Sequence, residues 1–396
     1  MPVAPVAPVT PVTPERVYGE IAESVRTRVV STGGFHNRNY RVVLTERQAL
    51  PLGRSTGGSV LVRVRRSGRE LVRRTWSDED AVLTALAARP VEDTGRETAG
   101  FPRVLHTSPG GSPSVISYAE GTTVAEAFPA GAHLSGQVID QIAEFFAWLT
   151  AFEEKDLPAL PEQWAEPEDS TGFMHGLVDY AQDRLADGHR ASFGRLFDGL
   201  GIADDAMRRF GDALPSLQRR PFALLHTDVH RNNLVIDRHG RLQVIDWEHA
   251  SFGDPVYDLA THLCRTRYPL DQQGRMIDSW ERAVRAVSPR HAEGLHQDLP
   301  RYLAYERAQS IYPDVIRAAL SLGAVVEDST LAAAVRRTRA ALVTAAEPLG
   351  LGAPPDDSRI RRLLLEWLHD SRGGPDPISA GRRRERASTE PGWWAR

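Results

Sequence analysis

The stretch from Leu224 to Ala260 reads LLHTDVHRNNLVIDRHGRLQVIDWEHASFGDPVYDLA. Its apolar residues form short runs separated by polar loops, which predicts strand, loop, strand, turn, strand, loop and then a helix. Gly240, between the second and third runs, supplies the positive φ that a tight hairpin turn needs. This pattern puts Asp228 and Asn233 on the loop before the hairpin and Asp246 at its end, so three oxygen-bearing side chains converge on one edge.

Three such groups suit phosphoryl transfer, which needs a base for the attacking hydroxyl and hard oxygen ligands for Mg²⁺. The spacing is H-x-D-x-x-x-x-N, followed by Ile-Asp, with the second Asp thirteen residues after Asn233. This motif resembles the catalytic hairpin of the aminoglycoside phosphotransferase and choline kinase families, which are relatives of the protein kinases. The downstream pattern W-E-x-A-x-x-G-D-P-x-Y-D-L-A is also similar to these small-molecule kinases.

The resemblance implies a role for each polar residue of the hairpin. Asp228 is then the catalytic residue that accepts or orients the acceptor hydroxyl. Asn233 and Asp246 are then the metal ligands, holding the Mg²⁺ that bridges the ATP phosphates. In the same interpretation His226 supports the loop and does not transfer a proton.

Two other interpretations of the loop use residue chemistry alone. The alternating side chains of His226, Asp228 and His230 share one face of a strand and could bind a transition metal. No further His or Cys stands at a matching spacing. Alternatively, Asp and Asn shape a turn, but that explains one of the oxygen-bearing residues and not all three.

The composition places limits on the protein. Of its 396 residues, 41% are hydrophobic and 25% charged, which is ordinary for a globular chain, and the net charge of −4 gives no case for nucleic-acid binding. The single cysteine, Cys264, rules out an intramolecular disulfide and fits a reducing cytoplasm. Because no apolar run is long enough to span a bilayer, we expect a cytoplasmic protein with no membrane partner.

A glycine pair lies in the first β-rich segment, in STGGFHNRN before YRVVL. The layout of strand, glycine turn and strand is typical of a loop that covers phosphates, although most such pairs are plain hairpin turns. The segment resembles the nucleotide loop of choline-kinase-like enzymes. In that interpretation Gly33, Gly34 and Asn37 bind the cofactor, with backbone N–H groups facing the phosphates.

The alternating run from Ser59 to Arg65 predicts a strand. In the resembling families this strand supplies the cation for the α- and β-phosphates, and we assign Arg63 to that role, with Arg65 on the same face as the alternative. Glu79 opens a predicted helix sixteen residues after Arg63, and we assign it to orient the strand cation. A plain helix-start acid, favoured by the dipole, is the other interpretation.

The segment PSVISYAEG from Pro113 to Gly121 predicts an edge strand. In kinase-like folds it is the hinge, where backbone groups of Ser117 to Ala119 bind adenine, so Ser117 and Ala119 complete the cofactor set. From Gly121 onward the sequence has helical periodicity, including a buried stripe at Val138, Ile142, Phe145, Leu149 and Phe152.

These features predict an α+β, two-lobed protein-kinase-like fold with a small β-rich first lobe and a larger helical second lobe. The predicted organisation is a Pro-rich flexible tail (1–16), a nucleotide-binding lobe (17–120), a helical catalytic and acceptor-binding lobe (121–372) and a disordered Arg-, Gly- and Pro-rich tail (373–396).

The predicted function is ATP- and Mg²⁺-dependent phosphorylation of a hydroxyl on a polar small molecule. Acidic residues near the catalytic edge suggest a cationic, aminoglycoside-like acceptor, and we assign Glu248, Asp254 and Glu306 to the acceptor side. A peptide hydroxyl on a biosynthetic precursor, a choline-type amino alcohol and a catalytically inactive nucleotide-binding protein are the alternatives. The sequence indicates no oligomeric state.

Overall fold

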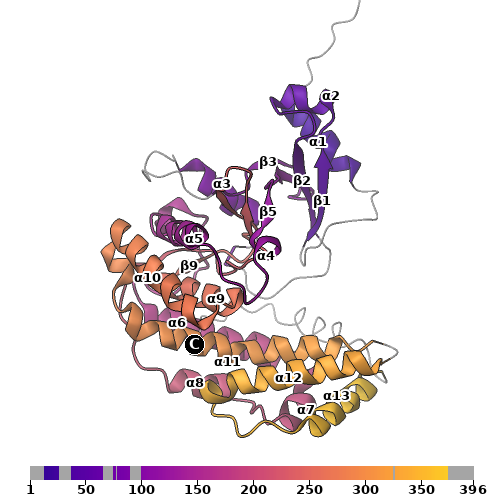
Figure 1. Ribbon diagram of the computed structural model, residues 1–396, viewed down its shortest axis with the longest axis vertical. Helices are drawn as coiled ribbons and strands as arrows, with labels where there is room; N and C mark the ends of the chain where they lie inside the picture. The colour runs from indigo at the N-terminus through magenta and orange to yellow at the C-terminus, as the bar shows by residue number, and fades with distance from the viewer. Residues whose placement is uncertain are drawn as a thin grey trace, which may run out of the picture. The chain divides into compact units, whose positions relative to one another are not determined.

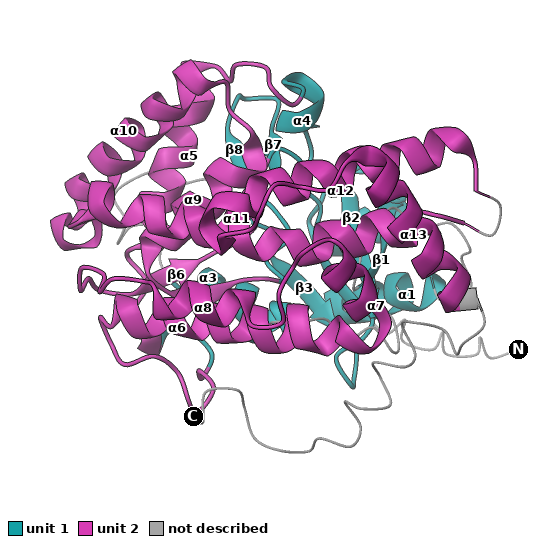
Figure 2. Ribbon diagram, turned by 90° about the horizontal axis from the view of Figure 1, so that it is seen from below, with its two compact units in different colours: residues 1–129, 156–158, 231–248 teal, residues 130–155, 159–230, 249–396 magenta. Residues whose placement is uncertain are grey.

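A computed structural model describes residues 13–25, 37–65, 75–76, 78–89, 100–323 and 326–372. The chain divides into two compact units (Figure 2). Unit 1 comprises residues 1–129, 156–158 and 231–248, and unit 2 comprises residues 130–155, 159–230 and 249–396. The hairpin that begins at Leu234 therefore belongs to unit 1, whereas Asp228 belongs to unit 2.

Unit 1 is built on a four-stranded antiparallel sheet with the strand order β1-β2-β4-β3 (Figure 1). Its strands are β1 (Asn37–Val43), β2 (Ser59–Arg65), β3 (Val104–Thr107) and β4 (Ser114–Ser117). The predicted edge strand is wrong in one respect: β4 lies between β2 and β3, so it is internal. Strand β3 was not predicted, because it has only four residues and its pairing with β4 shifts register between Val104 and His106.

An N-terminal helix, α1 (Pro14–Ser24), packs on this sheet. Thr13 caps the helix by accepting a hydrogen bond from the N–H of Arg16 at 3.4 Å, and Pro14 occupies the first turn, where its missing N–H costs nothing. The helix buries one apolar face in the core of unit 1, through Val17, Tyr18, Ile21 and Ala22. The predicted tail of residues 1–16 is therefore too long at its end, and residues 1–12 lie outside the described chain.

Two short helices and a longer one complete this part of unit 1. The short ones are α2 (Glu46–Ala49) and the 3₁₀ turn η1 (Leu50–Leu52), and the longer is α3 (Glu79–Ala88). Asp78 caps α3 by accepting from the N–H of Asp80 at 3.0 Å. The predicted packed face of this helix is confirmed, since Val82, Leu83 and Leu86 are buried.

The predicted hairpin is confirmed as β7 (Leu234–Ile236) and β8 (Leu242–Val244), with β5 (Thr122–Thr123) added at the side of β7. In the turn, the Asp237 carboxylate accepts hydrogen bonds from the N–H groups of His239 and Arg241, and Gly240 has a φ of 75°. The short helix α4 (Val124–Ala127) follows β5.

Unit 2 is mainly helical, with one two-stranded pair formed by β6 (Ala223–Leu225) and β9 (Ser251–Gly253). Its helices before β6 are α5 (Gly136–Leu149), α6 (Ser170–Tyr180), the π-helical η4 (Ala181–Asp187), α7 (Gly188–Gly199) and α8 (Ala206–Asp212). Those after β9 are α9 (Pro255–Thr266), α10 (Leu270–Val287), η5 (Pro289–Ala292), α11 (Leu295–Leu320), α12 (Asp328–Leu349) and α13 (Asp357–Arg372). The turn η3 (Glu154–Asp156) joins α5 to α6.

Helix α11 runs beside α9 and α12 in the core of unit 2 (Figure 1). It contributes three buried tyrosines, Tyr302, Tyr305 and Tyr312. The predicted stripe on α5 is also confirmed, because Val138, Ile142, Phe145, Leu149 and Phe152 are all buried. Among the described helices, none combines the length and the apolar character needed to cross a membrane.

Candidate functional site

The first group of site residues lies in unit 1 and starts from Arg63 on β2. Its guanidinium is buried and forms ion pairs with Glu79 and Asp80, the first two residues of α3. Burial opposes the charged form of Arg63, but the neighbouring carboxylates raise its pKa. The predicted contact between the strand cation and Glu79 is therefore present, and Arg65, the alternative cation, is exposed.

Asp80 is a site residue that the sequence did not predict. This side chain is 8% exposed, and it accepts a hydrogen bond from Thr107 at 3.2 Å in addition to its ion pair with Arg63. Burial raises the pKa of Asp80, although the charge of Arg63 acts in the opposite direction. The only signal in the sequence was the run of three acids from Asp78 to Asp80, and such a run is usually a solvated helix start.

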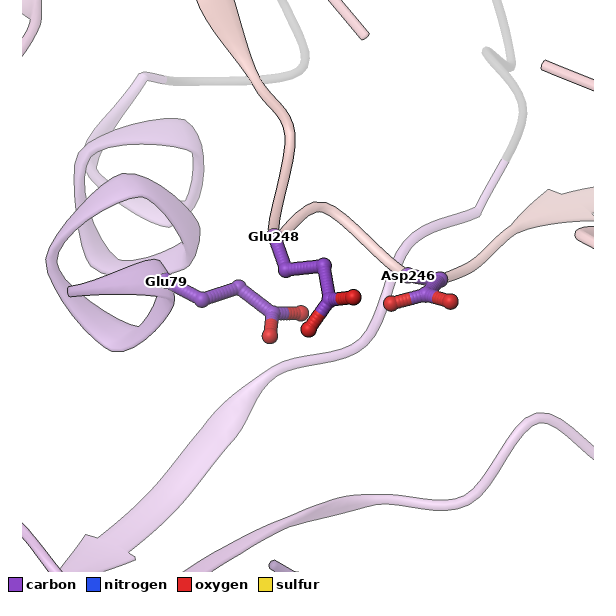
Figure 3. Close-up of side chains that lie close together, drawn as sticks. All are labelled: Glu79, Asp246 and Glu248. Carbon is purple, nitrogen blue, oxygen red and sulfur yellow. The ribbon is translucent and has the colours of Figure 1, made fainter. Parts of the chain in front are cut away.

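Glu79 is also the meeting point of a carboxylate cluster. Glu79, Asp246 and Glu248 each offer one oxygen, and these oxygens all lie within 4.8 Å of one another. Figure 3 shows Glu79 coming from α3 and the other two from the segment after β8. Three carboxylate oxygens in this spacing fit a hard cation such as Mg²⁺.

The backbone after β8 is shaped to bring these acids together. Asp246 has a φ of 68°, in the left-handed region that Asp tolerates better than most residues. The next N–H, that of Trp247, donates to Glu79 at 3.2 Å, and the Trp247 indole N–H donates to the carbonyl of Val244 at 3.0 Å. The turn therefore leaves Asp246 exposed while Glu248 is buried.

The structure thus groups Glu248 with Asp246, a predicted metal ligand, and with Glu79, the acid assigned to orient Arg63. Asn233, the second predicted metal ligand, is 6% exposed. Its carbonyl accepts from the N–H of Ile245 at 2.9 Å, which brings the Asn233 and Asp246 ends of the hairpin together.

The predicted nucleotide-binding residues are only partly within the described chain. Gly33 and Gly34 lie outside it, whereas Asn37 begins β1 and pairs in register with Arg65. In the predicted hinge, the N–H of Ser117 donates to the carbonyl of Arg103 at 2.8 Å, so the sheet already uses it. Ala119 lies just after β4, outside the strand pairing.

The second group of site residues lies in unit 2, on the loop that carries Asp228. Asp258 on α9 is buried, with 1% of its surface exposed. Its carboxylate accepts hydrogen bonds from the N–H groups of His226 and Thr227 at 2.7 and 2.8 Å. Thr227 has a φ of 58°, a strained value for a β-branched residue, and its hydroxyl donates to the carbonyl of His249 at 2.7 Å. These contacts hold the loop in one conformation.

Asp228 is mostly buried and is surrounded by cationic or potentially cationic groups. Arg265 on α9 forms an ion pair with its Oδ1, and Nε2 of His230 lies 3.5 Å from the same oxygen. Burial alone would raise the pKa of Asp228, but His230 and Arg265 together hold it well below its usual range. Asp228 is therefore ionised throughout the neutral pH range.

Asp254 requires a correction, because its surroundings do not fit the predicted acceptor role. It is fully buried, and both its oxygens accept from Arg220, while the hydroxyl of Tyr302 donates to Oδ2 at 2.8 Å. Asp254 also caps α9 by accepting from the N–H of Val256 at 2.9 Å. A carboxylate used in this way anchors the start of α9 to Arg220 and to Tyr302 on α11.

Glu306, the third predicted acceptor residue, lies on α11 and is 4% exposed. The side-chain amide of Gln309 donates to it at 3.3 Å, and its charge raises the pKa of Arg265. Glu306 therefore belongs to the same electrostatic group as Asp228 and Arg265, but it is buried beneath the surface.

Comparison with known proteins gives one family and several structures. The model of the "Phosphotransferase enzyme family" matches residues 28–305. Among curated protein sequences, none matches the chain. A proposed aminoglycoside phosphotransferase of Ralstonia eutropha JMP134 is 16% identical, with 84% of this chain and 98% of that chain covered and a TM-score of 0.54.

Two further solved structures are similar at lower scores. Choline kinase LicA from Streptococcus pneumoniae is 16% identical, covering 84% of this chain and 99% of its own, with a TM-score of 0.46. Macrolide 2'-phosphotransferase MphH from Brachybacterium faecium is 14% identical, covering 85% and 99%, with a TM-score of 0.45.

Proposed function

This chain belongs to the phosphotransferase enzyme family, and on that premise we propose that it transfers the γ-phosphate of Mg-ATP to a hydroxyl of a polar small molecule. The predicted family and the predicted α+β kinase-like fold are confirmed by the family match and by the similar structure from Ralstonia. The chain is an enzyme that transfers a phosphoryl group to a hydroxyl. We propose a role in this reaction for each of the following residues.

The observation that carries the proposal is the grouping of Glu79, Asp246 and Glu248 beside buried Arg63. We assign Asp246 and Glu248, with Asn233 at the same end of the hairpin, to hold Mg²⁺. Glu79 stays with Arg63 and fixes its position. When bound, Mg²⁺ supplies positive charge to the β- and γ-phosphates of ATP.

Arg63 is the proposed partner of the α- and β-phosphates. A guanidinium is always charged and can donate two parallel hydrogen bonds to a phosphate, so it can replace the lysine usual at this place. The ion pairs with Glu79 and Asp80 limit the rotamers of Arg63 and fix the position of its guanidinium before ATP binds. For adenine we propose the backbone of Ala119, since the N–H of Ser117 is already used within the sheet.

Asp228 is the proposed base. Its ionised carboxylate orients the acceptor hydroxyl and takes the proton as the new bond forms between the hydroxyl oxygen and the γ-phosphorus. The bond between that phosphorus and the β,γ-bridging oxygen breaks, and ADP leaves with the electron pair. A carboxylate with a lowered pKa is a weak base, which suits a loose transition state where the proton moves late.

The proposed acceptor is a hydroxyl of a polar natural product. The expectation of a cationic, aminoglycoside-like acceptor depended on carboxylates that face it. Asp254 is instead consumed by Arg220, Glu306 is buried, and Glu248 lies in the carboxylate cluster of unit 1.

Mg-ATP turnover tests the proposed function. Release of ADP should require Mg²⁺, should stop with EDTA, and should be lost in Asp246→Asn, which keeps the shape of the side chain but removes its charge. Asp140→Asn changes a carboxylate on α5 that takes no part in the cluster, and it should turn over normally. ADP release at the wild-type rate in Asp246→Asn would overturn the metal assignment.

A further inference from the structure

The surroundings of Asp228 point to a property of the acceptor. Arg265 and Asp228 form an ion pair in unit 2, but the two side chains differ in exposure: that of Arg265 is 39% exposed and that of Asp228 is 12% exposed. Of the two charged side chains, that of Arg265 is therefore the more accessible to solvent.

The guanidinium has more donors than its ion pair uses. Arginine carries five N–H donors in a planar fork, and within the described residues the contact of Arg265 is the one through Nη1 to Asp228. A planar fork of this kind is suited to a carboxylate or phosphate, which it can bind through two parallel hydrogen bonds.

The other acids of unit 2 near Arg265 do not cancel its positive charge toward an acceptor. Glu306 interacts electrostatically with Arg265, but it is 4% exposed and lies beneath the surface. The acids farther along the chain are occupied: Asp254 by Arg220, and Asp258 by the backbone of the catalytic loop. Asp314 on α11 forms an ion pair with Arg317.

We propose that Arg265 is a specificity-determining residue, and that the acceptor carries an oxyanion, a carboxylate or a phosphate, close to the hydroxyl that is phosphorylated. This inference rests on the proposed function. A hydroxyl that reaches Asp228 brings its neighbouring substituent within range of Arg265. An oxyanion there accepts the remaining N–H donors, whereas an ammonium group meets a like charge.

Three sugars with one pyranose ring and different charges test this: glucuronate, glucose and glucosamine. Each sugar is titrated into the wild-type enzyme with Mg-ATP, and the rate of ADP release is measured. A sugar that is an acceptor increases this rate, whereas a sugar that only competes for the site lowers the basal rate of ATP hydrolysis. The half-effective concentration should be lowest for glucuronate and highest for glucosamine. It should rise with salt for glucuronate.

Arg265→Gln should raise the half-effective concentration of glucuronate about tenfold, the effect of losing one charge-assisted contact, and should change that of glucose little. Arg265→Lys, which keeps the charge, should restore part of the preference. Arg267→Gln is the matched control, because Arg267 directly follows the last residue of the same helix and makes no ion pair among the described residues. A purely structural role for Arg265 would instead lower kcat equally for all three sugars.

The possible failures are distinguishable. If the wild-type enzyme releases no ADP from Mg-ATP under any condition, the proposed function fails. If ADP is released but glucosamine acts at the lowest concentration, or none of the sugars has an effect, the inference about Arg265 is wrong and the phosphotransferase proposal stands.

Discussion

Arg63 on β2 and Glu79 at the start of α3 form a buried ion pair, and Glu79 also lies within reach of Asp246 and Glu248. One carboxylate thus links the strand that carries the cation to the turn that carries the acids. Because both partners of the pair are buried, neither has the freedom of a solvated side chain, and the geometry of unit 1 around the proposed nucleotide phosphates is set before any ligand binds.

Replacement of Arg63 tests this arrangement. Arg63→Ala should raise the KM for ATP by about 10- to 100-fold, because the variant loses one or two charge-assisted hydrogen bonds to the phosphates. It should also lower the free energy of unfolding by about 3–5 kcal/mol, because Glu79 and Asp80 lose their buried cation. Arg65→Ala, on an exposed side chain, should do neither. ATP titration and urea denaturation measure the two effects, and the reverse ranking of the two arginines would contradict the assignment.

Glu248→Gln tests the carboxylate cluster. If Glu248 helps hold Mg²⁺, the concentration of Mg²⁺ that gives half-maximal ADP release should rise about tenfold or more. Glu144→Gln, on the exposed face of α5, should leave the Mg²⁺ dependence unchanged. If Glu248→Gln instead leaves the Mg²⁺ dependence unchanged and alters the KM for the acceptor, Glu248 binds the acceptor and not the metal.

Asp254→Asn tests the correction made to that residue. Its replacement leaves Arg220 without its main partner in a fully buried place, so the free energy of unfolding should fall by about 3–5 kcal/mol. The acceptor KM of the folded fraction should stay the same. Asp314→Asn, in a partly exposed ion pair, should change stability by less than about 1 kcal/mol. A stable Asp254→Asn protein with a raised acceptor KM would contradict the anchoring role.

Asp258 should make stability depend on pH. Burial raises its pKa to about 7, although the two backbone N–H groups and Arg265 lower it. The pKa of an unfolded Asp is about 3.9. Since the folded chain binds the proton more tightly, this contribution is fully present below about pH 4 and is lost as the pH rises through about 7.

Urea denaturation of the wild type and Asp258→Asn between these pH values measures that contribution. The wild type should lose stability relative to the variant as the pH rises. A constant difference between the two proteins at every pH would show that Asp258 is ionised over the whole range.

The hairpin, the helices and the Arg63–Glu79 contact could be predicted because their signals are local or fixed by spacing. Alternating apolar runs and Gly240 define the hairpin, and the sixteen residues between the strand cation and the helix acid match a known pattern. The N-terminal boundary was wrong because the proline repeat before it obscured the start signal of Thr13, Pro14 and Glu15.

The partners of the acidic residues could not be predicted, because they come from distant parts of the chain. Asp254 meets Arg220, which is 34 residues away, and Asp228 meets Arg265, which is 37 away. In an arginine-rich sequence, no pattern tells which arginine lies opposite which acid. The expectation of a negative acceptor side counted acids without their partners: charges can be counted from a sequence, but their pairing follows from the fold.

The central claim, transfer of the γ-phosphate to a hydroxyl oriented by Asp228, is tested most directly by measuring phosphorylated acceptor and ADP together in the wild type and in Asp228→Asn. We expect equal amounts of the two products in the wild type. In the variant we expect unchanged ATP affinity and a rate of transfer lower by at least about 100-fold. Transfer at the wild-type rate in Asp228→Asn, or loss of ATP affinity together with the chemistry, would contradict it.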